Sequence, residues 1–309
     1  MNRRGFIRSA TLLSAAVASG AWTEHALAKR TSGRIVILHT NDVHSRIDPF
    51  PMNDPKFPGA GGFAKRASLI RQIRSENEHV LLFDAGDIFQ GTPYFNLFQG
   101  EPEIRLMNEM GYDAATIGNH DFDGGIDNLA RRIKEARFSF INANYDFSGT
   151  PLDGLCQPMK TFVAGNYKVG VFGIGIELNG LVAPAMSGSV RYLDPVINAS
   201  KMARLLRKEH GCDLVICLSH LGYSYDNEKI SDVKLAGLTE GIDLIIGGHT
   251  HSFLDEPARI RNAGGTTTLV AQAGWGGIRL GRVDFLFGQE YTEKILSYSD
   301  AKTFYYAIA

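Results

Sequence analysis

Two pairs of chemically active residues stand just after apolar runs of the sequence. Asp42 and His44 come after IVILHT, and His249 and His251 come after DLIIGG. The members of each pair are two positions apart, so their side chains project from the same face if strand geometry continues. Further polar residues that end apolar runs are Asp87, Asn119, His120 and His220. Each residue alone is more typical of a turn, a cap or a structural position, but together they predict one site.

The side chains of this group are those that bind divalent metal ions. Imidazoles, carboxylates and one amide oxygen, without a thiolate, suit Mn, Fe, Co or Zn, and composition does not choose among them. The predicted ligands are Asp42, His44, Asp87, Asn119, His220, His249 and His251. These are too many for one ordinary site, whereas two ions about 3.5 to 4 Å apart, bridged by one carboxylate, would use them all. His120 remains free for another role, and His39 is predicted to be structural or to support a ligand.

The elements that position these residues are short strands alternating with helices. Apolar runs rich in β-branched residues and flanked by Gly or Asp predict buried strands at 35–44, 79–87, 114–121, 168–175, 213–220, 243–251 and 266–274. Spacings of three and four predict helices around Phe63, Ala67, Ile70 and Ile73, around Ile126, Leu129 and Ile133, and around Ala199, Met202, Ala203 and Leu206. The alternation predicts an α/β domain. In open α/β sheets, ligands bind at the carboxyl ends of the strands.

No repeat, low-complexity segment or linker divides the chain. Residues 45–62 and roughly 145–166 are irregular and predict loops. The apolar pattern continues to residue 287, and residues 291–309 are predicted to form one final helix or an extended tail. A chain of 309 residues that is 44% hydrophobic can bury a substantial core. We predict a single domain over residues 29–309.

The first 28 residues have the pattern of an export signal. A basic start is followed by an apolar stretch from Ala10 to Trp22 and by the small-residue pattern Ala26-Leu27-Ala28, which suits cleavage. The segment RRGFIR resembles a twin-arginine motif. The apolar stretch is short and rich in Ala, Ser and Gly, which argues against a stable membrane anchor. We predict a twin-arginine signal peptide over residues 1–28 and a periplasmic protein, with a retained leader as the alternative.

Charge and cysteine content exclude two further classes of protein. The formal net charge is −1 at pH 7, and no basic patch or like-charged tail is present, so no binding to a nucleic-acid polymer is expected. Cys156, Cys212 and Cys217 are too few and too irregularly spaced for a disulfide framework. Buried thiols are the simplest interpretation.

Five motifs in a fixed order carry a family resemblance. HTNDVH, FDAGD, TIGNHDFD, LSHLG and GGHTH resemble the calcineurin-like metallophosphoesterases, in particular the N-terminal catalytic domain of the bacterial 5'-nucleotidase family. GGFAKRASLI and AGWGGIRLGRVDF add to the likeness, which covers residues 34–287.

The resemblance implies a fold and a set of metal ligands. The fold is a four-layer α/β/β/α sandwich with two mixed sheets and a dinuclear site along one edge. One ion would be held by Asp42, His44, Asp87 and His251. The other would be held by Asp87, Asn119, His220 and His249. Asp87 would then be the bridge.

The resemblance also implies a catalytic dyad of His120 and Asp123, with Asn119 and His120 in contact with the phosphate. Asp121 stands where family members often have Glu, which is a mild departure. Hydroxide bound to the metal ions would attack phosphorus in line. His120, if protonated and oriented by Asp123, would stabilise the developing charge or donate to the leaving alkoxide.

We therefore expect an exported, 5'-nucleotidase-like dinuclear-metal phosphohydrolase that acts on a nucleotide or another phosphate monoester. The alternative is a broader phosphomonoesterase or a cyclic-nucleotide phosphodiesterase, and an outside alternative is an inactive metal-binding interaction protein. His120 and Asp123 argue against the last, since a pure binder does not need them. Larger family members carry a C-terminal domain whose aromatic residues stack on the base. Nothing after residue 287 is long enough for that domain, so a separately encoded partner chain that supplies it is a hypothesis.

Overall fold

The computed structural model describes residues 33–287 and 302–308. All of these residues except Gly33 and Phe287 belong to one compact unit. The signal peptide predicted over residues 1–28 lies outside the described residues, as do residues 288–301. Among the described helices, none combines the length and the apolar character needed to cross a bilayer.

The first sheet contains the strand that leads to Asp42. Its strand order is β14-β13-β1-β2-β3-β4. The strands are β1 (Gly33–Thr40), β2 (Val80–Asp84), β3 (Ala114–Ala115), β4 (Ser139–Phe140), β13 (Arg279–Phe287) and β14 (Lys302–Ala307). The strands β1 to β4 are parallel, while β14 is antiparallel to β13. Every residue of β1 from Ile35 onward is buried, as is usual for a strand covered on both faces.

The second sheet contains the strands that lead to His220 and His249. Its order is β11-β12-β10-β9-β7-β6. The strands are β6 (Met159–Ala164), β7 (Tyr167–Ile174), β9 (Leu214–Ser219), β10 (Leu244–Ile246), β11 (Ala258–Arg261) and β12 (Thr267–Ala271). The four inner strands are parallel, and the edge strands β6 and β11 are antiparallel to their neighbours. A separate pair is formed by β5 (Tyr145–Asp146) and β8 (Arg191–Tyr192).

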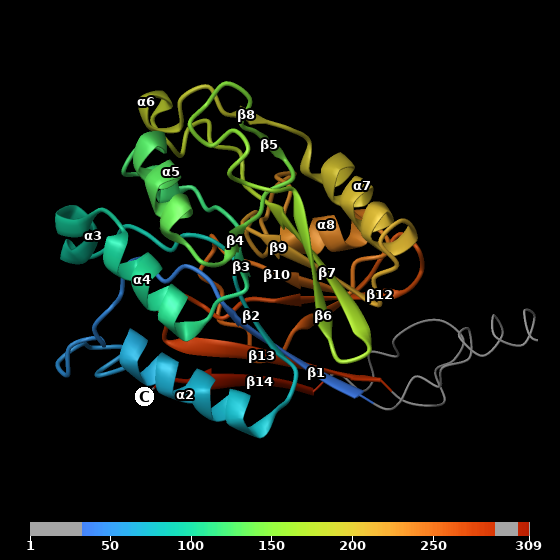
Figure 1. Cartoon of the computed structure of the whole chain (residues 1–309), viewed down its shortest axis with the longest axis horizontal. Helices are drawn as coiled ribbons and strands as arrows, with labels where there is room; N and C mark the ends of the chain where they lie inside the picture. The colour runs from blue at the N-terminus through green and yellow to red at the C-terminus, as the bar shows by residue number, and fades with distance from the viewer. Residues whose placement is uncertain (1–32, 288–301, 309) are drawn as a thin grey trace, which may run out of the picture. The chain divides into compact units, whose positions relative to one another are not determined.

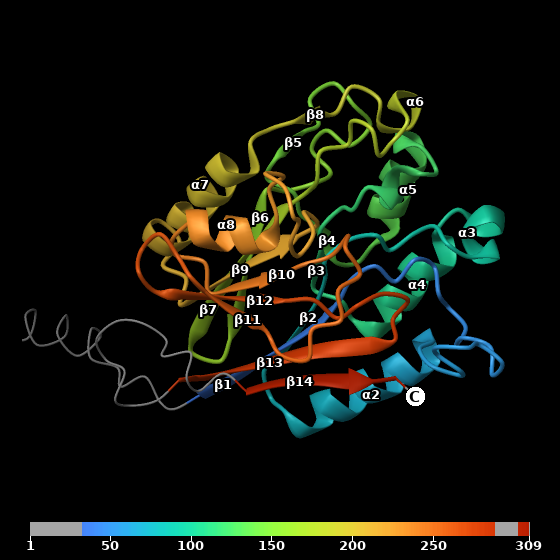
Figure 2. The same cartoon turned by 180° about the vertical axis from the view of Figure 1, so that it is seen from behind.

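Helices alternate with the strands along the chain. They are α2 (Phe63–Glu76), α3 (Pro93–Phe98), α4 (Glu101–Met110), α5 (Ile126–Glu135), α6 (Pro184–Ser187), α7 (Pro195–Lys208), α8 (Asp232–Leu238) and the 3-10 helix η1 (His120–Phe122). Helices α2, α4 and α5 share one apolar core with β1 and β2, and α7 and α8 share another with β7, β9 and β10. Figures 1 and 2 show α2, α4 and α5 beside the first sheet and α7 and α8 beside the second. Between the sheets, the rings of Phe83 and Phe162 lie 5.7 Å apart. The predicted α/β fold with two mixed sheets is confirmed.

The helices predicted from apolar spacing are present as α2, α5 and α7. Helix α7 also has a clear start signal, because the Asp194 side chain accepts a hydrogen bond from the Ile197 amide at 2.8 Å and Pro195 occupies the first turn. Helices α3, α4, α6 and α8 were not predicted. The cysteines are free: Cys212 and Cys217 are buried, and Cys156 is half-buried.

Two predictions about irregular segments were wrong. The stretch 145–166 contains β5 and β6, both of which form antiparallel pairs. Residues 302–307, within a segment predicted to be a helix or a tail, form β14 along β13. Pairing with β13 gives backbone groups along one side of that segment hydrogen-bond partners. The Gly61 amide also donates to the Ile308 carbonyl at 2.6 Å, which fixes the end of β14.

Candidate metal centre

The carboxyl ends of strands from both sheets meet at one edge of the unit. The strands β1 and β2 of the first sheet, and β9 and β10 of the second, all end there. Two contacts join the sheets at this edge: His220 Nδ1 lies 2.7 Å from the Ala85 carbonyl oxygen, and the His249 amide donates to Asp42 Oδ1 at 2.9 Å. The loops after these four strands therefore form one continuous surface.

The loops at this edge have an unusual backbone. The φ angle is +50° at Asp42, +51° at His44, +56° at Asp87, +70° at His249 and +53° at His251. Strand geometry does not continue through either pair, so the prediction made on that basis was wrong about the backbone. A left-handed non-glycine residue costs about 1–3 kcal/mol, and such strain is concentrated at functional sites. Backbone hydrogen bonds stabilise the left-handed conformation here, from Asp42 N to Gly86 O at 2.9 Å and from His44 N to Asp87 O at 3.0 Å.

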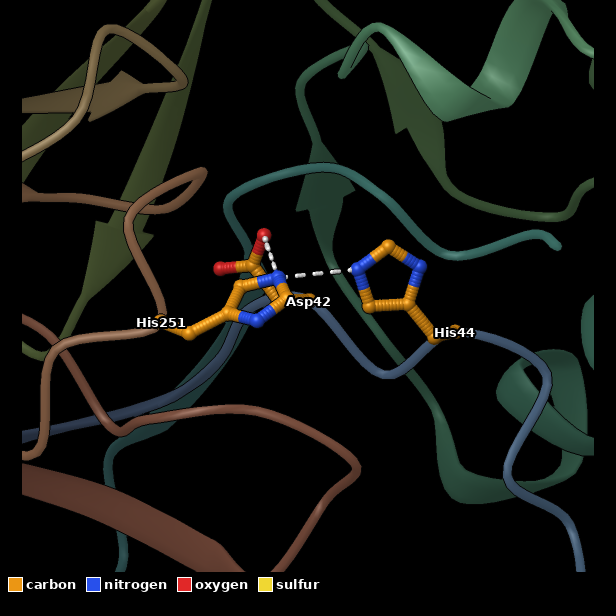
Figure 3. A group of neighbouring side chains, drawn as sticks. All are labelled: Asp42, His44 and His251. Carbon is orange, nitrogen blue, oxygen red and sulfur yellow. Dashed lines mark hydrogen bonds and ion pairs between the residues drawn. The ribbon is translucent and has the colours of Figure 1, made fainter. Parts of the chain in front are cut away.

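Asp42, His44 and His251 form a first group, whose ligand atoms lie within 4.8 Å of one another. His251 Nε2 lies 3.0 Å from His44 Nε2 and 3.5 Å from Asp42 Oδ1. Figure 3 shows the two imidazoles facing each other from separate loops, with the carboxylate beside them. The Asp42 side chain is fully buried and that of His251 is 40% exposed. The group is therefore open to solvent at His251.

Asp87, His220 and His249 form a second group, with ligand atoms again within 4.8 Å of one another. His220 Nε2 lies 3.1 Å from Asp87 Oδ2. His249 Nδ1 lies 2.8 Å from Asn119 Oδ1, which adds the amide oxygen to this group. The structure thus brings all seven predicted ligands to one place.

Asp87 reaches both groups. Its Oδ2 lies 3.1 Å from His220 Nε2 and 3.8 Å from His44 Nε2. Its Oδ1 accepts a hydrogen bond from the His120 amide at 2.8 Å. A buried carboxylate with an imidazole from each group beside it could be shared by two cations.

The donor atoms fit a pair of metal ions. Ligand bonds of about 2.0–2.2 Å place neighbouring ligand atoms about 2.8–3.6 Å apart, from octahedral to tetrahedral geometry. The imidazole and amide atoms of both groups have spacings within this range. His220 is also in the right tautomer, because its Nδ1 faces the Ala85 carbonyl and so carries the proton. Its Nε2 is buried and has no hydrogen-bond partner among the described residues, although Asp87 Oδ2 lies 3.1 Å away. A cation bound there could be a partner for both His220 Nε2 and Asp87 Oδ2.

The electrostatics of the site also favour cations. Burial would lower the pKa of His220, but the carboxylates of Asp87 and Asp42 raise it to about 10. Burial would raise the pKa of Asp87, but His220 lowers it below its usual range. Burial and the charge of His220 lower the pKa of His249 to about 4, and burial lowers that of His44. The lowered pKa values keep His249 and His44 neutral, which is the form that binds metal ions, and a cation at Asp87 would take the place of the proton that Asp87 and Asp42 favour on His220.

His120 and Asp123 lie together beside the groups, at η1. His120 Nδ1 is 2.7 Å from Asp123 Oδ2, and the His120 ring centroid is 5.4 Å from that of His44. Burial would lower the pKa of His120, but Asp87 and Asp123 raise it above its ordinary value. The side chain is 38% exposed. His120 can therefore hold a proton where a substrate would approach.

Asp121 is a supporting residue that the sequence reasoning missed. It is fully buried, and its carboxylate accepts hydrogen bonds from the amides of Asp87 at 3.1 Å, Ile88 at 2.9 Å, Phe89 at 3.2 Å and Gly118 at 2.7 Å. These bonds hold the loop that carries Asp87. The only sequence signal was that Asp121 differs from the residue common in the similar family.

Asn41 is a second such residue. Its Nδ2 donates to Asp42 Oδ2 and to the Gly274 carbonyl, both at 2.6 Å, and its Oδ1 accepts from the Ala273 amide at 2.8 Å. It therefore fixes both a candidate ligand and the loop after β12.

By contrast, His39 is fully buried in β1 outside the two groups, and burial lowers its pKa to about 3.

This chain is similar in sequence and in structure to several known proteins. Residues 35–253 match the family described as Calcineurin-like phosphoesterase. The snake venom 5'-nucleotidase of Gloydius brevicauda is 36% identical over 233 residues. The trifunctional nucleotide phosphoesterase protein YfkN of Bacillus subtilis strain 168 is 33% identical over 288 residues. The crystal structure of a 5'-nucleotidase precursor from Thermus thermophilus superposes with a TM-score of 0.79 at 31% identity.

These similarities cover most of this chain but only part of the other proteins. The matches cover 72%, 83% and 89% of this chain for the venom protein, the Bacillus protein and the Thermus structure, respectively. They cover 38%, 18% and 54% of those proteins. The chain thus spans less than two thirds of each.

Proposed function

Since the chain belongs to the calcineurin-like phosphoesterase family, we propose that it is a dinuclear-metal phosphohydrolase of the 5'-nucleotidase type, acting on phosphate monoesters. The observation that carries this proposal is the convergence of two candidate metal-binding groups with Asp87 between them. Similarity to a venom 5'-nucleotidase and a Thermus 5'-nucleotidase precursor supports a nucleotide as the substrate.

We assign the seven side chains to two ions. One is held by Asp42, His44, Asp87 and His251, and the other by Asp87, Asn119, His220 and His249. Mn, Fe, Co and Zn all suit this set of nitrogen and oxygen donors. When bound, the ions supply a Lewis acid for the phosphate oxygens and make water available as a nucleophile near neutral pH. The hydrogen bonds of Asn41 and Asp121 hold the ligand loops in place beforehand.

His120 is the residue that we assign to proton transfer. Asp123 accepts from Nδ1, which directs Nε2 of the same ring away from the dyad. A protonated Nε2 would stabilise charge on the phosphate oxygens or donate to the leaving alkoxide. Asn119, the preceding residue, lies in the second group, so substrate phosphate held there would also be within reach of His120.

Asp123→Asn is predicted to lower kcat and to shift its pH dependence. The carboxylate raises the pKa of His120, so its loss lowers that pKa. His120 acts in its protonated form, so activity is lost as pH rises through its pKa, and the alkaline limb of the kcat profile should move to lower pH in the variant. We expect kcat to fall about 10-fold at neutral pH, a part of the contribution usual for a general acid. An unchanged alkaline limb would contradict the assignment.

A substrate panel tests the proposed reaction. The protein, loaded in turn with Mn²⁺, Co²⁺ and Zn²⁺, would be assayed with AMP, cyclic AMP and p-nitrophenyl phosphate. Preferential release of phosphate from AMP is the expected result. Comparable rates on all three would favour the broader phosphoesterase, an alternative supported by the similarity to a trifunctional nucleotide phosphoesterase. No turnover with any metal would refute hydrolysis and leave a metal-binding interaction protein.

We also propose that the protein is exported to the periplasm through the twin-arginine route. The motif RRGFIR and the pattern Ala26-Leu27-Ala28 support this proposal. Replacing both Arg3 and Arg4 with lysine should retain the protein in the cytoplasm, as measured by cell fractionation. Undiminished export of that variant would count against the route.

We also propose that a separately encoded partner chain recognises the base of the substrate. It predicts that the native protein elutes from a sizing column as a complex larger than 33.9 kDa. A lone monomer that already discriminates AMP from p-nitrophenyl phosphate would exclude the need for such a partner.

A further inference from the structure

We propose that Trp275 is a positioning residue for His251 and thereby sets the affinity of the first group for its ion. The inference rests on the proposed function. The indole and the imidazole are stacked, with ring centroids 5.7 Å apart and an interplanar angle of 11°. Trp275 itself is not a metal ligand, so any effect must act through His251.

Burial holds the His251 side chain less firmly than the other two members of its group. Its side chain is 40% exposed, against 9% for His44 and none for Asp42. A histidine that binds a metal usually donates its other ring N–H to an oxygen, which fixes the ring, as His220 does toward Ala85. Within the described residues, the only hydrogen-bond contact of the His251 ring is from Nε2 to His44. Stacking on Trp275 therefore takes the place of the missing hydrogen bond.

The backbone around Trp275 is tied to the opposite side of the same group. The Gly276 amide donates to the Asp42 carbonyl at 2.7 Å. Asn41 Nδ2 donates to the Gly274 carbonyl at 2.6 Å. The indole is thus fixed relative to Asp42, and it presents a flat surface on which the imidazole of His251 can rest.

The loop at residues 45–62 holds the indole from another side. The ring of Phe50 meets Trp275 edge-on, with centroids 5.4 Å apart, and that of Phe57 does so at 6.5 Å. Phe50 is buried, and the Arg46 guanidinium covers its face at 4.2 Å. These aromatic neighbours therefore fix the orientation of the Trp275 indole, and stacking on the indole fixes that of the His251 imidazole.

This role predicts a graded effect of substitution. Trp275→Leu keeps an apolar side chain but removes the flat surface, so His251 can leave its ligand orientation. We expect the affinity for one ion to fall about 10- to 100-fold, as for the loss of a residue that orients a metal ligand. Trp275→Phe keeps a ring and should restore most of that loss. The ion in the group of Asp87, His220 and His249 should be bound as in the wild type.

The test is equilibrium dialysis of the full chain against Mn²⁺ and, in parallel, Zn²⁺, with bound metal counted by mass spectrometry. Phe138→Leu is the matched control, because it removes a buried aromatic ring that packs on Phe140, away from the site.

Trp275 also offers a direct optical readout. The chain has two tryptophans, and the other, Trp22, is in the leader segment. In a Trp22→Phe background, ion binding at His251 should change the indole emission.

The expected result is weaker binding of one ion in Trp275→Leu, rescue in Trp275→Phe and no loss in Phe138→Leu. Two ions bound by Trp275→Leu with wild-type affinities would overturn this inference and leave the proposed function intact. An equal loss in Phe138→Leu would also overturn it, because general destabilisation would then explain the effect. A wild-type chain that binds no pair of ions would overturn the proposed function as well.

Discussion

Replacing Asp87 with alanine should release metal from both groups. Its Oδ2 lies 3.1 Å from a nitrogen of the second group and 3.8 Å from one of the first, so the substitution removes a ligand from each ion. It also leaves the buried Nε2 of His220 without the nearest negative charge. Losing a residue that only orients a ligand costs about 10- to 100-fold in metal affinity, so losing a shared ligand should cost more. Metal content after dialysis measures the effect.

Asp113→Ala is the matched control for Asp87→Ala. The Asp113 carboxylate also accepts a backbone hydrogen bond, from the Leu82 amide at 2.8 Å, but it lies outside both groups. It should keep two ions per chain. If Asp87→Ala retained one ion with wild-type affinity, Asp87 would belong to a single group and the shared-carboxylate assignment would be wrong.

Replacing His120 with alanine should have the opposite profile, with turnover lost and metal retained. Its ring is hydrogen-bonded to Asp123, and its hydrogen bond to the ligand Asp87 comes from the backbone amide, which the substitution keeps. General acid catalysis contributes about 10²- to 10⁴-fold, and kcat should fall by that order with AMP as substrate. Steady-state kinetics on protein of verified metal content provide the measurement.

The comparison between the two variants is more informative than either alone. Asp87→Ala should lose metal and activity together, whereas His120→Ala should lose activity alone. Equal metal loss in both would refute the division between ligand and proton donor. Full activity in His120→Ala would remove His120 from the chemistry and leave the ligand assignments untouched.

The position of the site was predictable from the sequence because of one topological rule. Parallel strands next to each other end at the same edge of a sheet, so polar residues after β1 and β2 had to approach one another, as had those after β9 and β10. The meeting of the two pairs from separate sheets was implied only by the family resemblance. The periodic apolar spacing of α2, α5 and α7 was equally informative, since each helix buries one face against a sheet. These two features allowed the fold class and the candidate ligands to be predicted without coordinates.

The local geometry of the ligand loops was not predictable in the same way. The left-handed backbone at Asp42 and His249 is imposed by contacts with other loops, such as that between Asp42 N and Gly86 O. Those contacts join segments far apart in the sequence, which no short pattern describes. Contacts between distant segments also produce the four amide hydrogen bonds to Asp121 and the stacking of Trp275 on His251.

Strand β14 shows a further limit. Its residues, KTFYYA, alternate too weakly to distinguish a strand from a helix, and the pairing depends on the free edge of β13. Strands β3 and β4 have two residues each, and their assignment follows from neighbouring strands more than from composition. Tertiary context therefore decides these elements.

Anomalous diffraction from crystals grown with Mn²⁺ would show whether two ions share Asp87. We expect two anomalous peaks about 3.5 to 4 Å apart, one among Asp42, His44 and His251 and the other among Asn119, His220 and His249, with Asp87 contacting both. A single peak, or peaks that do not both contact Asp87, would contradict this expectation.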